Sequence, residues 1–196
     1  MKKIILIEDR KERQKEFLSE STLMELKNIE ELFLPEEADC TRILSSINAK
    51  EMESLESYSL IIVHASRLDT NGFKALEEYC GKGKKYLILF SGGFSQTIYQ
   101  EANFKLLRAN SKDFYSDKLL QFLRKFIEQE TVHLTELVYG DSWKLSFLLH
   151  YRHNKGILKN SPNGRRELEL EEFGHSFNFD QINDIDKDIN ERILGL

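Results

Sequence analysis

Short segments rich in apolar residues alternate with longer amphipathic ones along the first 130 residues of the chain. The short segments are typical of buried strands, and they cover residues 3–7, 29–34, 58–63, 86–90 and 104–108. The longer segments carry apolar residues near helical spacing, and they predict helices over 10–26, 36–48, about 73–81 and from Asp117 onward. Within the last of these, Leu119, Leu123 and Ile127 form an i, i+4, i+8 stripe, and Asp117 is placed to cap the helix.

Alternation of apolar strands with helices predicts a parallel sheet that is covered on both faces. Five such strands favour an α/β, flavodoxin-like sheet with the strand order 2-1-3-4-5. In sheets of this order, sites lie beyond the carboxyl ends of strands 1 and 3, where the order reverses. We therefore look for candidate functional residues directly after residues 7 and 63.

The last third of the chain departs from this alternation. Two helical segments, 131–139 and a second from Asp141-Ser142, are separated by Gly140. An Asn-Gly pair at 163–164 predicts a hairpin, and residues 180–193 predict a final acidic helix. We predict an α/β domain over 1–130 and an α+β extension over 131–196. The many large apolar residues of the extension favour a part that packs on the domain or docks a partner over a flexible tail.

Charge and composition narrow the class of protein. The net charge of the 196 residues is −5, so no overall basic field attracts nucleic acid. The apolar run 4–7 is too short for a signal peptide, and no later run is long enough to span a membrane. The two cysteines, Cys40 and Cys80, are interpreted as reduced thiols. These features predict a cytoplasmic protein without a membrane segment.

A histidine ends the third predicted strand. His64 follows the apolar run 58–63, and Gly72 comes eight residues after it. This layout resembles that of bacterial response-regulator receiver domains, in which an aspartate at the corresponding position accepts a phosphoryl group. An imidazole forms no acyl phosphate. The resemblance therefore implies a receiver-like fold that lacks its phosphorylation site.

Other residues match the receiver pattern at the ends of the remaining strands. Glu8-Asp9 stands where receivers bind Mg²⁺, Ser91 where they have a hydroxyl residue, and Arg108 where they have a lysine followed by proline. Arginine offers a planar fork in place of a point charge. The spacing between Ser91 and Arg108 is shorter than in receivers, so the fourth helix, around residues 94–100, is expected to be short or remodelled.

The resemblance implies a non-enzymatic pseudo-receiver that acts as a regulatory protein–protein interaction module in bacterial signalling. It implies no cofactor beyond weak Mg²⁺ binding by Glu8 and Asp9, because His64 removes the third carboxylate. If His64 pairs with these acidic residues, their charge should raise its pKa. We expect a protein partner, and the oligomeric state stays open.

Two alternative functions follow from other residues. A window without acidic residues carries the basic side chains of Lys144, Arg152, Lys155, Lys159, Arg165 and Arg166. It would suit a nucleic-acid-binding regulator, although such a charge run is more often a solvated surface. A weaker alternative is a hydrolase in which His64 acts with Glu8 and Asp9.

Overall fold

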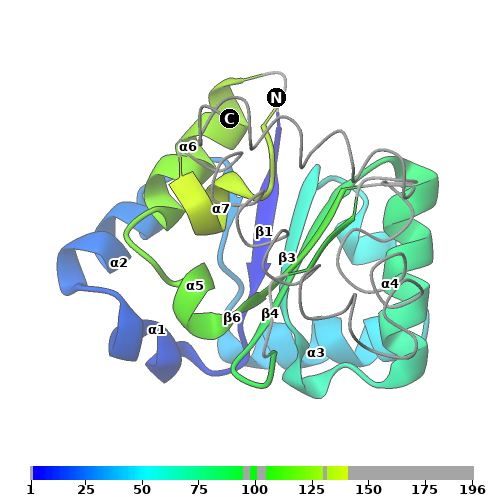
Figure 1. Ribbon diagram of the computed structural model, residues 1–196. Coiled ribbons are helices and arrows are strands. Elements are labelled where there is room, and N and C mark those ends of the chain that lie inside the picture. Colours follow the sequence, from blue (N-terminus) through cyan, green and yellow to red (C-terminus); the bar gives the residue numbers. More distant parts are fainter. Residues whose placement is uncertain (1, 95–97, 101–104, 130–131, 141–196) are drawn as a thin grey trace, which may run out of the picture.

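The computed structural model describes residues 2–94, 98–100, 105–129 and 132–140. The described strands form one sheet in the order β2-β1-β3-β4-β6-β5 (Figure 1). Their bounds are β1 (Ile4–Ile7), β2 (Leu32–Phe33), β3 (Leu60–His64), β4 (Tyr86–Ser91), β5 (Ile98–Gln100) and β6 (Leu106–Asn110). All neighbouring pairs are parallel except β5 and β6. The predicted flavodoxin-like order 2-1-3-4-5 is confirmed, with β6 as the fifth parallel strand.

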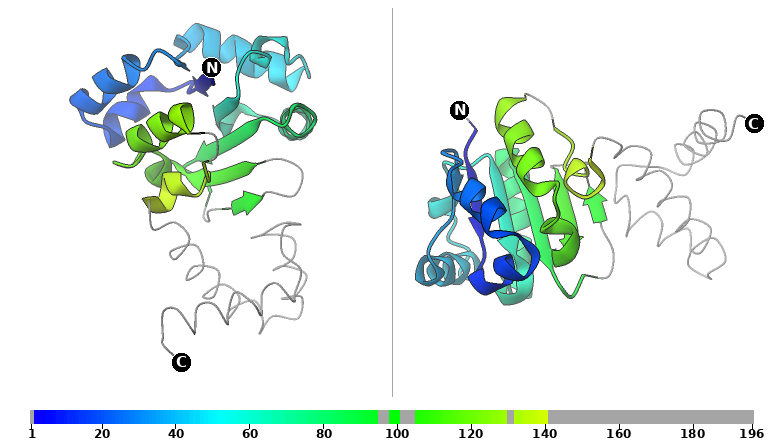
Figure 2. Two further views of the ribbon diagram at one scale, coloured as in Figure 1. Left: turned by 90° about the horizontal axis from the view of Figure 1, so that it is seen from above. Right: turned by 90° about the vertical axis from the view of Figure 1, so that its left-hand side faces the viewer.

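Helices cover both faces of the sheet (Figures 1 and 2). One face carries α3 (Glu37–Asn48) and α4 (Thr70–Gly83). The other face carries α1 (Lys11–Phe17), α2 (Glu20–Lys27), α5 (Ser111–Phe114), α6 (Leu119–Glu128) and α7 (Glu136–Tyr139). Two short 3₁₀ turns, Glu53–Leu55 and Ala65–Arg67, lie before and after β3.

The single helix predicted over residues 10–26 is wrong, because the chain breaks into α1 and α2. Leu18 is extended, with φ −112° and ψ 141°, and its side chain is buried. Ser19 then caps α2, its side chain accepting a hydrogen bond from the backbone N–H of Thr22 at 3.2 Å. A serine hydroxyl that satisfies a free N–H favours a helix start over a helix interior, and the break turns Leu18 into the core.

The chain between β4 and β6 contains a strand where the receiver pattern has a helix. Residues 98–100 form β5, which pairs antiparallel with β6 through Ile98 and Arg108, Tyr99 and Leu107, and Gln100 and Leu106. The segment that was expected to be short or remodelled thus extends the sheet by one edge strand.

The start of α6 also differs from the prediction. Lys118, and not Asp117, is the N-cap residue, and no side chain caps this helix. The predicted apolar stripe is confirmed, since Leu119 and Leu123 are fully buried and Ile127 packs against the same core.

The side chains of the central strands alternate between two apolar cores, one on each face of the sheet. In β3, Leu60 and Ile62 face the side of α2 and α6, and Ile61 and Val63 face α3 and α4. All four are fully buried, so each contributes about 1.5–3 kcal/mol of hydrophobic stabilisation. This sandwich fixes the sheet and therefore the ends of β1 and β3.

Residues 132–140 pack onto the α/β domain. Val132, Leu134 and Leu137 are buried in the core that includes α5 and α6. The predicted helix over 131–139 is a single turn, α7. The hairpin at 163–164 and the acidic helix over 180–193 lie outside the described residues, so the division at 130/131 stays a prediction. Among the described residues, no helix has the length and apolarity needed to cross a membrane.

Candidate functional site

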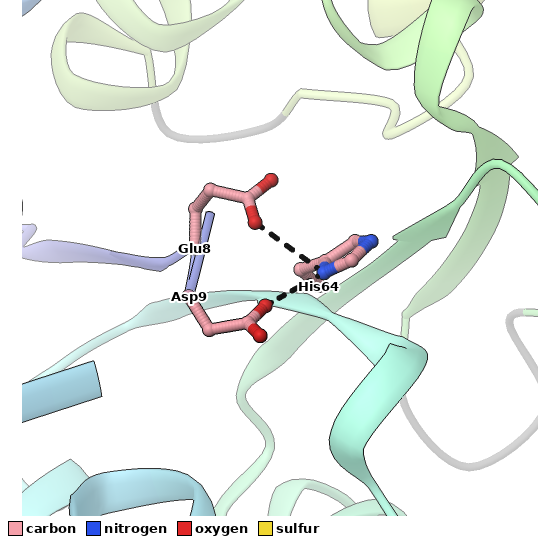
Figure 3. Close-up of side chains that lie close together, drawn as sticks. All are labelled: Glu8, Asp9 and His64. Atoms are coloured by element: carbon pink, nitrogen blue, oxygen red, sulfur yellow. Dashed lines mark hydrogen bonds and ion pairs between the residues drawn. The ribbon is translucent and has the colours of Figure 1, made fainter. Parts of the chain in front are cut away.

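The ends of β1 and β3 bring three buried polar side chains together. Ile7 pairs with Val63 in the parallel register, so Glu8-Asp9 and His64 leave the sheet at the same edge (Figure 3). The exposed fractions of Glu8, Asp9 and His64 are 2%, 0% and 0%. This edge is the switch point at which sites of flavodoxin-like sheets form. We call these three residues the acidic–histidine cluster.

Both nitrogens of His64 have partners. Nδ1 lies 2.9 Å from Asp9 Oδ1 and 3.3 Å from Glu8 Oε1. On the other side of the ring, Nε2 lies 2.6 Å from Nη1 of Arg13. A guanidinium can only donate hydrogen bonds, so Nε2 must be the unprotonated acceptor. His64 is therefore a neutral imidazole that carries its proton on Nδ1 and donates it to Asp9.

Asp9 is held between His64 and Arg67. Arg67 Nε lies 2.7 Å from Asp9 Oδ2, an ion pair without hydrogen-bond geometry. The side chain of Arg67 is 48% exposed and lies over the fully buried carboxylate. Burial raises the pKa of Asp9, but the hydrogen bond from His64 and the charge of Arg67 outweigh burial, so the pKa lies below its ordinary value. Asp9 is the ionised member of the cluster.

Glu8 behaves differently from its neighbour. Burial raises the pKa of Glu8 to about 7. The hydrogen bonds that Glu8 accepts from the Arg10 backbone N–H and the Tyr115 hydroxyl lower this pKa, but by less than burial raises it. These bonds are 3.0 Å to Oε1 and 3.1 Å to Oε2. Adjacent carboxyl groups with opposite pKa shifts mean that the cluster carries between one and two negative charges near neutral pH.

The pKa of His64 is lowered, because burial of the ring outweighs the hydrogen bond and the charge of Asp9. The charge of Arg13 lowers it further. The expectation that pairing with the acidic residues would raise this pKa is therefore wrong: an imidazole with no exposed surface loses more hydration on protonation than one carboxylate returns. This direction agrees with the neutral ring that the contact with Arg13 requires.

The cluster has the donor set of a candidate metal site, since one ligand atom from each residue lies within 4.8 Å of the others. Mg²⁺ prefers oxygen ligands, and an imidazole nitrogen is a poor third partner. Moreover, Arg67 contacts the carboxylate of Asp9, and Arg13 contacts the unprotonated Nε2 of His64. As these residues stand, two guanidinium groups take the place of a cation, and the site does not fit Mg²⁺.

Ser91 and Arg108, the other two predicted site residues, are not brought to the cluster. Arg108 lies within β6, opposite Leu89. It bonds Glu77 of α4 at 2.5 Å and lies over the ring of Phe73 at 5.0 Å. Ser91 accepts a hydrogen bond from the backbone N–H of Gly93 at 3.2 Å. Arg108 thus points to the helix layer opposite the one that supplies Arg13.

Sequence reasoning missed four side-chain partners of the cluster: Arg13, Ser66, Arg67 and Tyr115. Arg67 follows His64 by only three residues, so its position beside the end of β3 could have marked it as a candidate partner. Arg13 lies one helical turn after the acidic pair, a weaker signal. Nothing in the spacing marks Tyr115, which reaches Glu8 from a position 107 residues away.

The contacts of His64 differ from those of a hydrolytic triad. Ser66 Oγ and Asp9 Oδ1 both approach Nδ1, at 3.0 Å and 2.9 Å. In a triad the serine and the carboxylate contact different ring nitrogens. Here Arg13 covers the second nitrogen, which leaves no atom of the ring to act as a general base.

The predicted basic surface of Lys144, Arg152, Lys155, Lys159, Arg165 and Arg166 lies outside the described residues. Its role in binding nucleic acid stays a prediction. Comparison with protein-family models, with curated proteins and with solved structures found no significant match to this chain. The fold and the acidic–histidine cluster are therefore the features that bear on function.

Proposed function

We propose that this protein is a pseudo-receiver: a non-enzymatic, regulatory protein–protein interaction module of bacterial-type signalling that does not accept phosphate. The observation that carries the proposal is the state of His64. It stands at the end of β3, where a phospho-acceptor would lie, and it is fully buried with partners on both nitrogens.

The electrostatics of the cluster support the same proposal. Asp9 already has a cation, Arg67, at 2.7 Å from its second oxygen. Since a guanidinium needs no ligand exchange and is supplied by the chain, the charge of Asp9 is compensated without a divalent ion. A receiver pocket in this state would hold one conformation irrespective of phosphodonor and Mg²⁺. Its output would then depend on partner binding.

Intact-mass spectrometry tests the absence of phosphoryl transfer. The native protein is incubated with acetyl phosphate and Mg²⁺ beside an active receiver domain as positive control. We expect no phosphoryl adduct on the native protein. An adduct that is lost in the Asp9→Asn variant, but retained in Asp113→Asn on the exposed turn α5, would overturn the proposal.

The interaction role needs its own test. Affinity capture from the native host, followed by a binding titration with each purified candidate, should give a protein whose affinity is unchanged by acetyl phosphate. Capture of nucleic acid with a strong salt dependence would instead favour the basic-segment alternative. An affinity that rises severalfold with the phosphodonor would contradict the phosphate-independent module.

A further inference from the structure

Helix α1 covers the sheet without burying any of its seven residues. A helix that lies on a sheet normally buries one apolar face, and interiors normally leave few voids. The next helix, α2, buries only Leu26. The space beneath these two helices is a cleft of about 580 Å³, bounded on the other side by β1, β2 and the start of α3.

Roughly half of the surface that lines the cleft is apolar. This apolar wall is formed by Leu6 of β1, Leu23 of α2, Leu32 of β2, and Leu34 and Pro35 of the loop that follows β2. A volume of this size lies within the range of roughly 300–1,000 Å³ typical of small-molecule sites. An apolar group of several carbons would therefore gain from entering it.

Three lysines and two glutamates are the charged residues of the lining. Lys11 and Lys15 of α1, and Lys27 at the end of α2, line the cleft together with Glu8 and the exposed Glu36. Lys11 pairs with Glu36 at 2.6 Å. Lys15 and Lys27 have no ion pair within 4 Å in the described part of the chain.

Two of these lysines stand in an unfavourable arrangement. Lys11 and Lys15 are four residues apart on one helix, a spacing at which like charges repel. Glu36 already compensates Lys11, and the charge of Lys27 also acts on Glu36. An anion in the cleft would therefore gain chiefly from Lys15, with Lys27 as the second cation. Gln14, on the same side of α1, adds a hydrogen-bonding group within the lining.

We propose that this cleft binds a small amphipathic anion, an apolar chain or ring with one carboxylate, whose apolar part fills the wall and whose charge meets the lysines. The site is distinct from the acidic–histidine cluster, although Glu8 contributes to the lining of both. The proposal does not depend on the pseudo-receiver function, because it uses neither His64 nor the absence of phosphorylation.

Octanoate is the probe that tests the proposal, with octylammonium as the cation of equal chain length and 1-octanol as the uncharged one. Binding to the full-length protein is followed by backbone-amide NMR shifts during titration. We expect saturable binding of octanoate in the millimolar range, as a ligand of ten heavy atoms allows. The shifts should cluster in α1, α2, Leu34 and Glu36, and octylammonium should give none that saturate.

Charge variants test whether the lysines are responsible for octanoate binding. In Lys15→Gln/Lys27→Gln we expect roughly tenfold weaker octanoate binding, because each exposed ion pair is worth up to about fivefold. Lys74→Gln, an exposed lysine of α4 on the other side of the sheet, is the matched control and should bind as the native protein does.

A cavity-filling variant supplies a second test. Leu34→Trp, which places a larger ring in the partly buried wall, should abolish octanoate binding while the amide spectrum stays dispersed. The proposal is overturned if native protein shows no saturable shifts, if octylammonium or octanol binds as well as octanoate, or if the lysine variants bind like Lys74→Gln. A failure here leaves the mass-spectrometric test of phosphoryl transfer unaffected, so the two proposals fail separately.

Discussion

The two faces of the sheet are packed to different degrees. On one face, α3 buries Cys40, Ile43, Leu44 and Ile47, and α4 approaches it closely at Gly72. On the other face, α1 buries nothing and α2 buries one residue. The face with α1 holds the cleft of about 580 Å³ and supplies Arg13 to the acidic–histidine cluster. On the closely packed face, a second pocket of about 670 Å³ is lined by residues of the segment between α3 and β3 and of the end of α4.

The difference has a cause in the sequence. The helix that could have covered this face is divided by Leu18 and Ser19, so each piece is too short to present an apolar stripe of several turns. The residues that would have filled the space are lysine and glutamine. The short, polar helix α1 therefore leaves a cleft beside the sheet, and its polar side chains line this cleft and contact the acidic–histidine cluster.

The largest expected effect is the loss of stability when a leucine is truncated on the closely packed face, compared with the same truncation beside the cleft. Leu76→Ala removes a fully buried side chain of α4 and should cost about 3 kcal/mol, within the 2–5 kcal/mol typical of such cavities. Leu23→Ala, beside the open cleft, creates no closed cavity and should cost less than half as much. Urea unfolding of both variants measures these losses of stability, and equal losses would show that the α1 face is packed as closely as the other.

Glu8 gives an effect of similar size that depends on pH. Its folded pKa of about 7 lies above the ordinary 4.5, so the native state binds more protons than the unfolded state between these values. Stability should therefore fall as pH rises through this window. With about 1.4 kcal/mol per pKa unit, the fall is on the order of 3 kcal/mol.

The Glu8→Gln variant should abolish that fall. His64 acts in the opposite direction, since its lowered pKa removes stability as pH decreases below 6.5. Chemical denaturation of native protein and variant at about pH 5 and pH 8 compares the two. We expect the free energy of unfolding of the variant, relative to that of the native protein, to be larger at about pH 8 than at about pH 5. A gain of the same size at both pH values would contradict an elevated pKa for Glu8.

A smaller effect concerns the close approach of α3 and α4. A Cβ added at Gly72 would lie 2.1 Å from Oδ1 and 3.0 Å from Cα of Asn48. Asn48 cannot move freely, because it donates to Arg67 O and accepts from Asp69 N, at 3.0 Å and 3.1 Å. Gly72→Ala should therefore cost about 1–3 kcal/mol through overpacking.

Gly83→Ala is the control for this position. Its added Cβ would meet the side chain of Lys85 at 3.2 Å, which is flexible and can move away. We expect its melting temperature to stay close to that of the native protein. A Gly72→Ala variant as stable as Gly83→Ala would show that α3 and α4 can separate at little cost.

The smallest expected effect is that of Arg67→Ala. Asp9 is fully buried, but Arg67 is half-exposed, so water can take the place of the guanidinium beside the carboxylate. The loss should therefore be about 1 kcal/mol, at the upper end of the range for exposed pairs. The loss should shrink as salt is raised from low to high concentration. A loss above about 2 kcal/mol that is independent of salt would place this pair in the desolvated core rather than at its edge.

The sheet and the position of the cluster could be predicted from the sequence, whereas the direction of several side chains could not. Runs such as 58–63 and 86–90, alternating with amphipathic segments, favour buried parallel strands, and residues that follow such strands meet at one edge. Glu8, Asp9 and His64 stand at this edge, and the resemblance to receiver domains singled them out among the residues there.

Arg108 was misplaced for a related reason. The fifth parallel strand was predicted over 104–108 but runs from Leu106 to Asn110. A shift of two residues moves Arg108 from the end of the strand to its interior, where its direction is set by the alternation of the strand. Tertiary partners from α1 and from residue 115 depend on packing that no local pattern encodes.

The central claim is that His64 is neutral, has hydrogen-bond partners within the protein on both ring nitrogens, and belongs to a cluster that needs no metal. Side-chain ¹⁵N NMR of the His64 imidazole across a pH titration, with and without millimolar Mg²⁺, tests it directly. We predict the Nδ1–H tautomer, a pKa below 6.5, and unchanged nitrogen shifts on adding Mg²⁺. A pKa above 6.5, or a saturable Mg²⁺-dependent shift that disappears in Asp9→Asn, would contradict the account.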